Sequence, residues 1–591
     1  MPGIVGIAGS APPEESQHLL RRMLSVLMHD PSYSSGVCSA PEIGVYGGWA
    51  ALPGSFSEAQ SRSEEPGKPV LLFSGECFPA QAGSSKQTSL LLSYAADGER
   101  FIHTLNGLFS GLLIDRRRRI ALLFNDRFGS ERIYFSESDG NLFFASEAKA
   151  LLAVLPQTRA FDDEGVAQFL AYGSTRDNRT LFRGVSLMPA GSVWRLGEEP
   201  ARRRYFLPAE WEAQEPASTE EFETELVDAL RAVMPSYLEP ASKVGISITG
   251  GLDTRMIMAC LNAGEGGQVC YTYVGATGET LDARIGREVA EAVGLEHHNL
   301  RVTPDFLARF DHFVDETVRV TDGCCGVLGA HEILFSDQAR KLASIRLTGN
   351  FGSEILRSVT TYKPRRLAPG LLSPDFAGHV SAAARASTAD HPVTAAAFKE
   401  IPWHLFGTVS AARSRLTFRS PFMDNTIVKL AYRAPIASRT SAHAALRFVS
   451  ANEAVASIPT DRGVIAGAKG AGALAHRLFA DFTFKLDYLD KEGLPDWLAP
   501  AAPVLRMLAK LGLLGLHKFL PYRAWFQREL APFLNEALLS SHTRALPYFD
   551  PRFFSSVVRD TTAGRKNYLN EINAVLTLEA VERVLIRASS D

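Results

Sequence analysis

The segment from Ser247 to Thr254, with the sequence SITGGLDT, combines hydroxyl, glycine and acidic residues where an apolar strand is expected to end and a helix to begin. Two adjacent glycines, Gly250 and Gly251, let the backbone approach a ligand closely. A helix that begins after them directs unpaired N–H groups and the positive end of its dipole toward an anion. The segment therefore predicts a phosphate-binding loop.

Side chains of this loop sharpen the prediction. Thr249 and Thr254 add hydroxyl donors, and Ser247 and Leu252 complete the set of residues expected to bind a nucleotide. Asp253 is an acceptor, which suits a phosphate site when a divalent cation lies between its carboxylate and the phosphates. The loop lacks the Gly-Lys-Ser/Thr ending of a Walker loop and the GxGxxG spacing of dinucleotide folds. A tight strand-to-helix turn without a ligand is the alternative.

The elements around the loop alternate between strand and helix. Strands are predicted at 244–248, 268–274 and 299–302, and helices at 222–235, 254–263 and 281–293. Such alternation predicts a parallel sheet covered by helices on both faces. Open sheets of this kind bind ligands beyond the carboxyl ends of their strands, which is where the loop lies. Beyond about residue 370 the sequence is mostly helical.

The first 200 residues have a different pattern of predicted elements, since most of them are short apolar strands. Strands are predicted at 43–46, 70–73, 112–115, 120–124 and 142–145, with helices at 15–28, 87–105 and 163–171. This pattern predicts an α+β layered domain. The polar stretch PAEWEAQEPAST suggests a linker at 208–220 between domains at 1–207 and 221–591.

Composition excludes several classes of protein. The chain of 591 residues has 62 basic and 65 acidic residues, whereas nucleic-acid binders usually carry a basic excess. No run of 18 apolar residues predicts a membrane span, and the start lacks the basic region of a signal peptide. Six cysteines are too few for a disulfide scaffold, so we expect a cytoplasmic protein. The apolar segment 503–520 is expected to be a packing helix, with docking on a membrane surface as the alternative.

Several motifs together resemble one family. The loop resembles the SGGLDS pyrophosphate loop of the ATP pyrophosphatases, and specifically of the asparagine synthetases, with threonine in place of both serines. The segments NDRFG (125–129), FASEAKALL (144–152), LNGLF (105–109) and RSPFMD (419–424) resemble further motifs of that family in the same order. The resemblance implies an N-terminal nucleophile amidotransferase-like sandwich followed by an ATP-pyrophosphatase domain. That domain adenylates a carboxylate, releases pyrophosphate, and lets an amine attack the acyl-adenylate.

The amidotransferase half departs from the family pattern. The family nucleophile is a cysteine directly after the initiator methionine, where this chain has Pro2, which offers no thiol. The family's RGPD segment falls near residues 29–32 without its arginine, although Ser74-Gly75-Glu76 still resembles its NGE segment. Cys38 and Cys77 are alternatives for a relocated nucleophile. We predict that glutamine is not hydrolysed, as in the related β-lactam synthetases, carbapenam synthetases and lasso-peptide cyclases.

A second loop, LTGNFGSE at 347–354, resembles the LSGEGSDE loop of the family. Ser353 stands at the aspartate position of that loop, while Glu354 matches. The resemblance implies that Gly349 contacts the nucleotide and that Glu354, with Asp253, holds Mg²⁺. Loss of one carboxylate leaves fewer ligands for Mg²⁺. Either Glu354 binds the ion together with Asp253, or adenylation is impaired.

The acyl-transfer step calls for a cation near the acyl oxygen. The family has a basic residue after its RxPFLD segment, and the best local match is Arg462 in the sequence PTDRG. Because an arginine stays protonated in proteins, Arg462 is expected to stabilise charge rather than to act as a base. An ordinary loop arginine is the alternative, and Lys469 is a second candidate.

These observations predict an ATP- and Mg²⁺-dependent ligase that joins a small-molecule or peptide carboxylate to an amine of the substrate itself or to a free amine. Ammonia-dependent asparagine synthesis and a nucleotide-binding pseudoenzyme are the two alternatives. No nucleic-acid partner is expected, and a homodimer is a further expectation.

Overall fold

The computed structural model describes residues 2–62, 67–79, 90–239, 243–261, 267–276, 278–385, 390–466 and 520–587, together with four isolated positions between 478 and 507. The predicted segment 503–520 and Lys469 fall almost entirely outside these residues. Among the described helices, none is long and apolar enough to cross a membrane.

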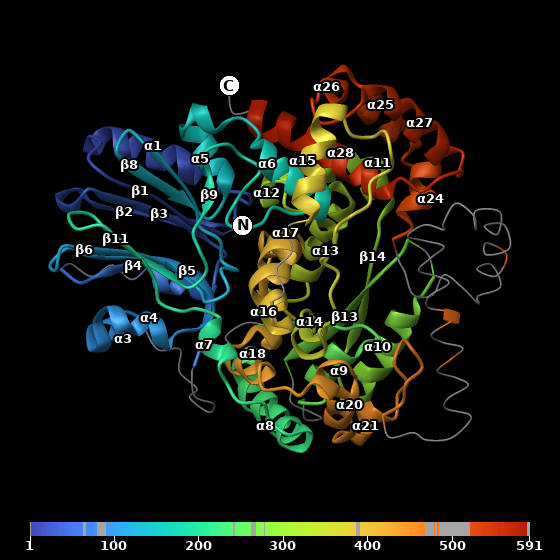
Figure 1. The fold of residues 1–591 in the computed structure, drawn as a ribbon. Helices are drawn as coiled ribbons and strands as arrows, with labels where there is room; N and C mark the ends of the chain where they lie inside the picture. Colours follow the sequence, from blue (N-terminus) through green and yellow to red (C-terminus); the bar gives the residue numbers. More distant parts are fainter. Residues whose placement is uncertain are drawn as a thin grey trace.

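The N-terminal domain contains two antiparallel sheets that pack face to face (Figure 1). The first has the order β2-β3-β1-β8-β7-β9, with β1 Gly3–Ala8, β2 Ser34–Ala40, β3 Val45–Ala51, β7 Tyr134–Ser138, β8 Asn141–Ala145 and β9 Ser186–Leu187. The second has the order β11-β10-β6-β5-β4, with β4 Val70–Phe78, β5 Asn106–Asp115, β6 Ile120–Asn125, β10 Ser192–Leu196 and β11 Ala201–Arg204.

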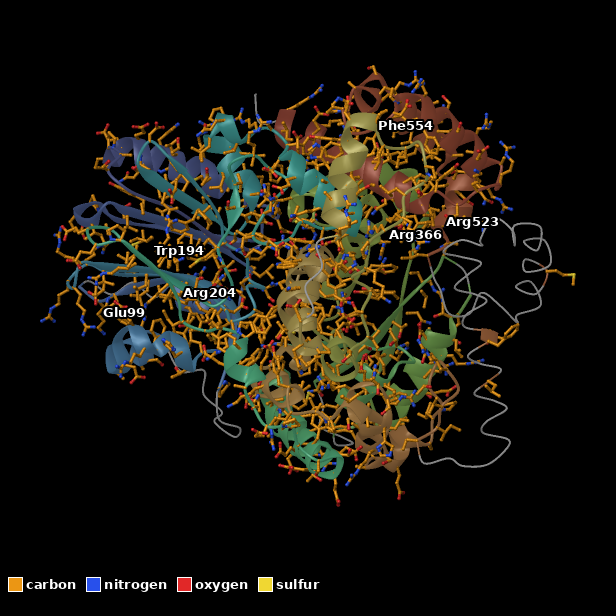
Figure 2. The ribbon with its side chains drawn as sticks, in the orientation of Figure 1. Glu99, Trp194, Arg204, Arg366, Arg523 and Phe554 are labelled. Atoms are coloured by element: carbon orange, nitrogen blue, oxygen red, sulfur yellow. The ribbon has the colours of Figure 1, made fainter. Side chains whose placement is uncertain are left out.

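Apolar side chains fill the space between the two sheets. Ile4 and Phe144 from the first sheet meet Leu72 and Leu123 from the second in one buried cluster. Trp194 on β10 belongs to the same cluster and lies within the sandwich (Figure 2). Helices α1 (Pro13–Ser25) and α5 (Ala148–Val154) cover the first sheet, α3 (Leu90–Asp97) and α4 (Phe101–Thr104) cover the second, and α6 (Asp163–Tyr172) packs beside α15 (Pro374–Arg385) of the second domain (Figure 1). The result is a four-layered α+β domain.

The stretch 208–220 connects the two domains and is itself packed. It contains the short helix α7 (Ala209–Glu212), whose Trp211 is buried against Phe206 and Phe398, with ring centroids 4.6 and 6.5 Å away. Helix α8 (Thr219–Leu238) then begins with a capping box formed by Ser218 and Glu221. The aromatic contacts of Trp211 fix the direction in which the chain enters the second domain.

The second domain is built on a parallel sheet with the order β14-β13-β12-β15-β16. The strands are β12 Val244–Ser247, β13 Gln268–Val274, β14 His297–Arg301, β15 Ile345–Thr348 and β16 Thr417–Arg419. Helices α9 (Leu252–Met258) and α10 (Leu281–Ala292) follow β12 and β13. Further helices are α12 Phe310–Thr321, α13 His331–Arg340, α14 Gly352–Arg357, α15 Pro374–Arg385, α17 Phe406–Arg413, α18 Asn425–Ala431 and α20 His443–Ser450.

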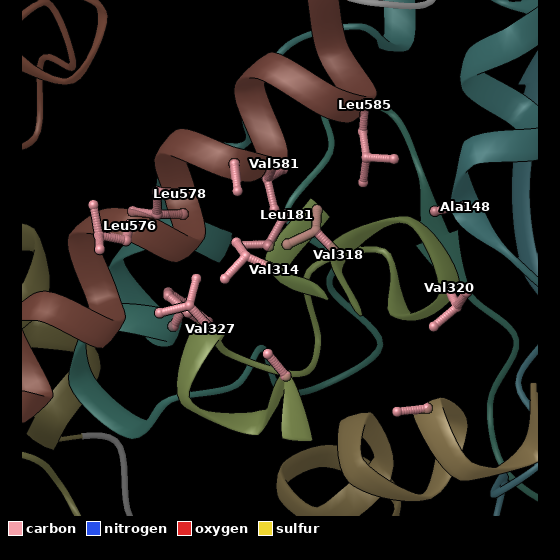
Figure 3. Packing of buried hydrophobic residues seen from close by; sticks show 14 of the residues in the cluster. Ala148, Leu181, Val314, Val318, Val320, Val327, Leu576, Leu578, Val581 and Leu585 are labelled. Atoms are coloured by element: carbon pink, nitrogen blue, oxygen red, sulfur yellow. The ribbon is translucent and has the colours of Figure 1, made fainter. Parts of the chain in front are cut away.

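The C-terminal helices close the core that the two domains share. They are α24 Tyr522–Gln527, α25 Ala531–Leu539, α26 Ser541–Arg544, α27 Pro551–Thr562 and α28 Leu569–Val581. Val581 on α28 faces Val314 and Val318 on α12, and Leu181 of the N-terminal domain joins them (Figure 3). The domains are also joined by buried hydrogen bonds, including one from Asn106 Nδ2 to Asp424 Oδ2 at 2.8 Å.

Candidate functional site

A cavity of about 400 Å³ lies at the carboxyl ends of β12, β13 and β15, and we refer to it as the sheet-edge cavity. Its volume falls in the range of about 300–1,000 Å³ that small-molecule sites usually have. Seven of the predicted residues line it: Ser247, Thr249, Gly251, Asp253, Thr254, Gly349 and Glu354. Gly250 and Leu252 lie in the same loop, but their atoms do not form part of the lining. Parallel pairing therefore brings two segments about 100 residues apart to one site.

Strand register explains how the two loops meet. Ser247 on β12 pairs with Thr348 on β15, so the residues after each strand leave the sheet side by side. Gly349 is the point of closest approach, because a Cβ atom there would lie 2.4 Å from the Thr254 nitrogen and 2.6 Å from its hydroxyl oxygen. Phe351 enters α14 with a φ of 77°, in the left-handed region that a bulky residue rarely occupies. Contact with the first loop thus determines the backbone conformation of the second loop.

Replacing Gly349 with alanine is expected to lower stability by about 1–3 kcal/mol, because the added methyl group would overlap the backbone of Thr254. Gly378 in α15 is a matched control, since nothing lies within 4 Å of a Cβ atom there. Gly378→Ala is expected to be neutral or stabilising, as alanine favours a helix. Chemical denaturation of both variants measures the difference, and equal stabilities would show that the two loops do not touch as described.

The N–H groups of the first loop are partly engaged within the protein. The Gly250 N–H donates to Asp282 Oδ1 at 2.7 Å, and the Gly251 N–H donates to Thr249 Oγ1 at 3.3 Å. Burial, together with the charge of Asp461, raises the pKa of Asp282 to about 6. Asp282, which begins α10, therefore orients the loop and also lines the cavity. The sequence offered one signal for this role, an acidic residue at the start of the helix after the second strand.

The carboxylate of Asp253 is bound by side chains of α14. Ser353 Oγ donates to Asp253 Oδ2 at 2.6 Å, and Arg357 forms an ion pair in which Nη1 lies 2.8 Å from Oδ1. Glu354 is adjacent, and burial, with a contribution from the charge of Asp253, raises the pKa of Glu354 to about 7. Burial therefore favours the neutral, protonated form of Glu354 more than it would for an exposed glutamate.

This donor set does not fit the magnesium grip that the sequence predicted. In nucleotide sites Mg²⁺ takes near-octahedral oxygen ligands, usually one or two free carboxylates together with substrate phosphates and waters. Asp253 is instead paired with a guanidinium group, and burial raises the pKa of Glu354. Among the described residues, no three His, Cys, Asp or Glu side chains gather in a way that could hold a metal ion.

The segment containing Arg462 packs against the first loop. The Asp461 N–H donates to the Gly250 carbonyl at 3.1 Å, and Arg255 on α9 donates to the Pro459 carbonyl at 3.0 Å. Arg255 also donates to the carbonyl of Ile458. Arg462 thus lies in a segment anchored to the loop, although the described residues that line the cavity do not include it. Its role in acyl transfer stays a prediction.

Aromatic residues that the sequence analysis did not single out form one wall of the cavity. Tyr271 and Tyr273 on β13 line it together with Arg346, whose guanidinium carbon lies 5.1 Å from the ring centre of Tyr273. Arg346 also pairs with the buried Glu332 on α13, at 3.5 Å. Arg346 therefore has partners inside the protein. The alternation of Tyr271 and Tyr273 along a strand could have indicated this wall.

A second, smaller pocket lies between the domains at the start of β1, and we refer to it as the N-terminal pocket. It is lined by Pro2, Ser74, Glu76 and Glu131, with Arg413 and Arg419 from the second domain. Its volume is about 60 Å³, far below that of ordinary small-molecule sites. Arg413 forms an ion pair with Glu131, which is 1% exposed, and Arg419 pairs with Glu76 at 2.8 Å. Two arginines of the second domain therefore fill this pocket.

The cysteines of the N-terminal domain do not supply a nucleophile to this pocket. Neither Cys38 nor Cys77 lines it. Burial raises the pKa of Cys77 well above its usual value, which keeps the thiol protonated and unreactive. Cys38 is buried in the core between the sheets.

Comparison with known proteins agrees with the two-domain organisation. A family model described as a glutamine amidotransferase domain matches residues 1–206, and one described as asparagine synthase matches residues 221–404. Asparagine synthetase 2 (glutamine-hydrolysing) of Arabidopsis thaliana is 26% identical over 219 residues, which cover 36% of this chain and 33% of the relative. Asparagine synthetase 1 of Bacillus subtilis is 20% identical over 393 residues, which cover 62% of this chain and 61% of the relative.

The chain thus spans about a third of the plant relative and less than two thirds of the bacterial one. Among solved structures, glutamine phosphoribosylpyrophosphate amidotransferase from B. subtilis matches 52% of this chain and 70% of its own, at 13% identity and a TM-score of 0.24. The two matches show an amidotransferase-type domain followed by an asparagine synthase domain and a helical C-terminal part, and with the loop motifs they support an asparagine synthetase-family protein.

Proposed function

We propose that this protein is an ATP-dependent carbon–nitrogen ligase that does not take its nitrogen from glutamine. One observation carries the proposal: the N-terminal pocket contains Pro2 and is filled by Arg413, whereas the sheet-edge cavity is open and lined by the nucleotide loop. The first pocket has Pro2 where a thiol would be needed, and its volume of about 60 Å³ leaves no room for an amino acid. The second has the volume, the hydroxyl groups and the position that a nucleotide site requires.

The proposed reaction has two steps. A carboxylate oxygen of the substrate attacks the α-phosphorus of ATP, forming an acyl-adenylate and releasing pyrophosphate. An amine nitrogen then attacks the acyl carbon, AMP leaves with the bonding electrons, and the amine loses a proton. Thr249 and Thr254 line the cavity, and in the proposed reaction their hydroxyl groups donate to phosphate oxygens as charge builds on the leaving pyrophosphate.

The second step needs an amine held close to the acyl-adenylate. Because the N-terminal pocket cannot release ammonia from glutamine, we infer that the amine is free or belongs to the substrate itself. The substrate is therefore a small molecule or a peptide that has a carboxylate. If the amine is not supplied as a free molecule, the same substrate also carries the amine. All six cysteines are free thiols, which suits the reducing conditions of the cytoplasm.

Pyrophosphate release tests the proposal. The full chain is incubated with ATP, Mg²⁺ and a panel of carboxylate substrates, without glutamine, and pyrophosphate and AMP are measured together. Equal amounts of both, formed only with particular substrates, are the expected result. An arm with aspartate and ammonium separates ammonia-dependent asparagine synthesis from other ligase reactions. Release of phosphate and ADP in place of pyrophosphate and AMP would contradict the proposal.

The variant Pro2→Cys is expected to remain unable to hydrolyse glutamine. A thiol at this position would still face a pocket of about 60 Å³ that Arg413 and Glu131 fill. Glutamate formation from glutamine measures the activity. The double variant Pro2→Cys/Arg413→Ala is the matched comparison, because it also removes the guanidinium group. Glutaminase activity in the single variant would show that the pocket is open in solution.

A second candidate function is nucleotide binding without turnover. It is favoured by the ion pair between Asp253 and Arg357, which engages the carboxylate expected to hold a metal ion. Calorimetry would then detect binding of ATP, while no AMP would form with any substrate. Substrate-dependent formation of AMP would exclude this candidate.

A further inference from the structure

The partners of Asp253 come from a single helix that follows β15. Ser353 and Arg357 are four residues apart on α14, so their side chains lie on the same face of the helix, toward the first loop. Arg357 Nη2 donates to both Asp253 Oδ2, at 3.1 Å, and Ser353 Oγ, at 2.7 Å. Nη1 lies 2.8 Å from Asp253 Oδ1 as an ion-pair contact, but neither atom makes a hydrogen bond, so the hydrogen bonds among the carboxylate, the hydroxyl and the guanidinium all involve Oδ2 or Nη2.

The backbone holds this arrangement in place. A Cβ atom on Gly352 would lie 2.7 Å from the Asp253 carboxyl carbon, so α14 approaches the aspartate at its first residue without a side chain between them. The Asp253 and Arg357 side chains are 17% and 16% exposed, which limits screening of the ion pair by water. A planar guanidinium that contacts both carboxylate oxygens is also a stronger and more directional partner than an ammonium group.

The remaining acidic groups do not provide a second grip for a metal ion. Ser353 offers a hydroxyl where a carboxylate would be needed, and it already donates to Asp253. Asp282 accepts from the Gly250 N–H. A divalent cation at Asp253 would lie beside the guanidinium of Arg357, so two positive charges would compete for one carboxylate in a poorly exposed place.

We propose that Arg357 takes the place of the divalent cation at the loop aspartate, so that Asp253 is a structural partner of a resident guanidinium and not a metal ligand. The inference rests on the proposed function in one respect only, namely that the sheet-edge cavity binds a nucleotide. It assigns a role to Arg357 that differs from a phosphate contact, because the described lining of the cavity does not include Arg357.

Binding of Mn²⁺ alone to the full chain, without nucleotide, tests this inference. The loss of the free Mn²⁺ signal in electron paramagnetic resonance reports the bound ion. The wild-type chain is expected to show no Mn²⁺ binding that depends on Asp253. Arg357→Ala frees the carboxylate and is expected to bind Mn²⁺ at least about tenfold more tightly, since an adjacent cation shifts carboxylate affinity for a proton by about 1–3 pKa units.

Matched variants make the result specific to this arrangement. Adding Asp253→Asn to the Arg357→Ala variant is expected to return its Mn²⁺ affinity to the wild-type level. Adding Ser353→Asp to the Arg357→Ala variant is expected to raise its Mn²⁺ affinity further. Arg357→Lys, which keeps the charge, is expected to behave like the wild type. Arg287→Ala, on the exposed side of α10, is the control for loss of an arginine elsewhere. Arg357→Gln replaces the alanine variant if that variant does not fold by circular dichroism.

Two results would overturn the inference. One is Mn²⁺ binding by the wild type that disappears in Asp253→Asn, and the other is a folded Arg357→Ala variant whose Mn²⁺ affinity equals that of the wild type. Calorimetry with ATP, in the presence and in the absence of Mg²⁺, is a separate measurement. Failure to bind ATP in either condition would contradict the proposed function and leave the Mn²⁺ result to decide the role of Arg357.

Discussion

Replacing Arg413 with alanine is expected to lower the free energy of unfolding by about 3–5 kcal/mol, because it leaves buried carboxylates without their cation. Arg413 ends α17 and reaches across the domain boundary into the N-terminal pocket, where it pairs with Glu131. Burial lowers the pKa of Arg413 to about 10, against the opposing charges of Asp126 and Glu76, so the guanidinium remains protonated at neutral pH. Denaturation with guanidinium chloride, followed by circular dichroism, measures the loss.

Two variants give this prediction its controls. Arg287→Ala removes an arginine that is 41% exposed and is expected to change stability by less than about 1 kcal/mol. Glu131→Gln in the Arg413→Ala background removes the unpaired charge and is expected to recover part of the loss. An Arg413→Ala variant as stable as Arg287→Ala would mean that the arginine does not fill the N-terminal pocket.

Replacing Asp253 with alanine is expected to reduce pyrophosphate release from ATP by about 100-fold, because a shift of about 1 Å in the groups that position the substrate can cost that much in rate. Asp253 joins the first loop to α14 through Ser353 and Arg357. Without it, the guanidinium of Arg357 loses its anion and the two loops lose the bond that sets their spacing. Asp253→Asn keeps the shape without the charge and separates the two effects.

Asp305→Ala is the control for this second prediction, because Asp305 is 60% exposed on α11 (Pro304–Ala308) and lies outside the cavity lining. It is expected to retain wild-type turnover. Pyrophosphate release by Asp253→Ala at the wild-type rate would contradict a role of the first loop in the reaction.

Most elements of both domains could be predicted from the sequence, because hydrophobic periodicity reports which face of a strand or helix is buried. The strand predicted at 268–274 has those bounds in the structure, and the helix predicted at 281–293 ends one residue earlier, at Ala292. The predicted helix at 254–263 begins at Leu252 and ends at Met258, because the turn after Gly251 already starts the helix. Strand β2 was missed, since SSGVCSA carries few apolar residues.

The site was only partly predictable, for a physical reason. A motif identifies residues that are close in sequence, so it located both loops that line the sheet-edge cavity. The ion pair of Asp253 with Arg357, and that of Glu131 with Arg413, join residues that lie 104 and 282 positions apart. Only the folded arrangement shows which charges neutralise one another, and these pairs decide whether a carboxylate is free for a metal or a pocket is free for a substrate.

Hydrogen–deuterium exchange tests the central claim most directly, because it reports separately on the nucleotide site and on the N-terminal pocket. A non-hydrolysable ATP analogue is predicted to slow exchange at 247–254 and 347–354, while glutamine leaves exchange at 2–8 and 74–78 unchanged. The account would be contradicted by slower exchange around the N-terminal pocket on addition of glutamine, or by an analogue that binds and protects neither loop.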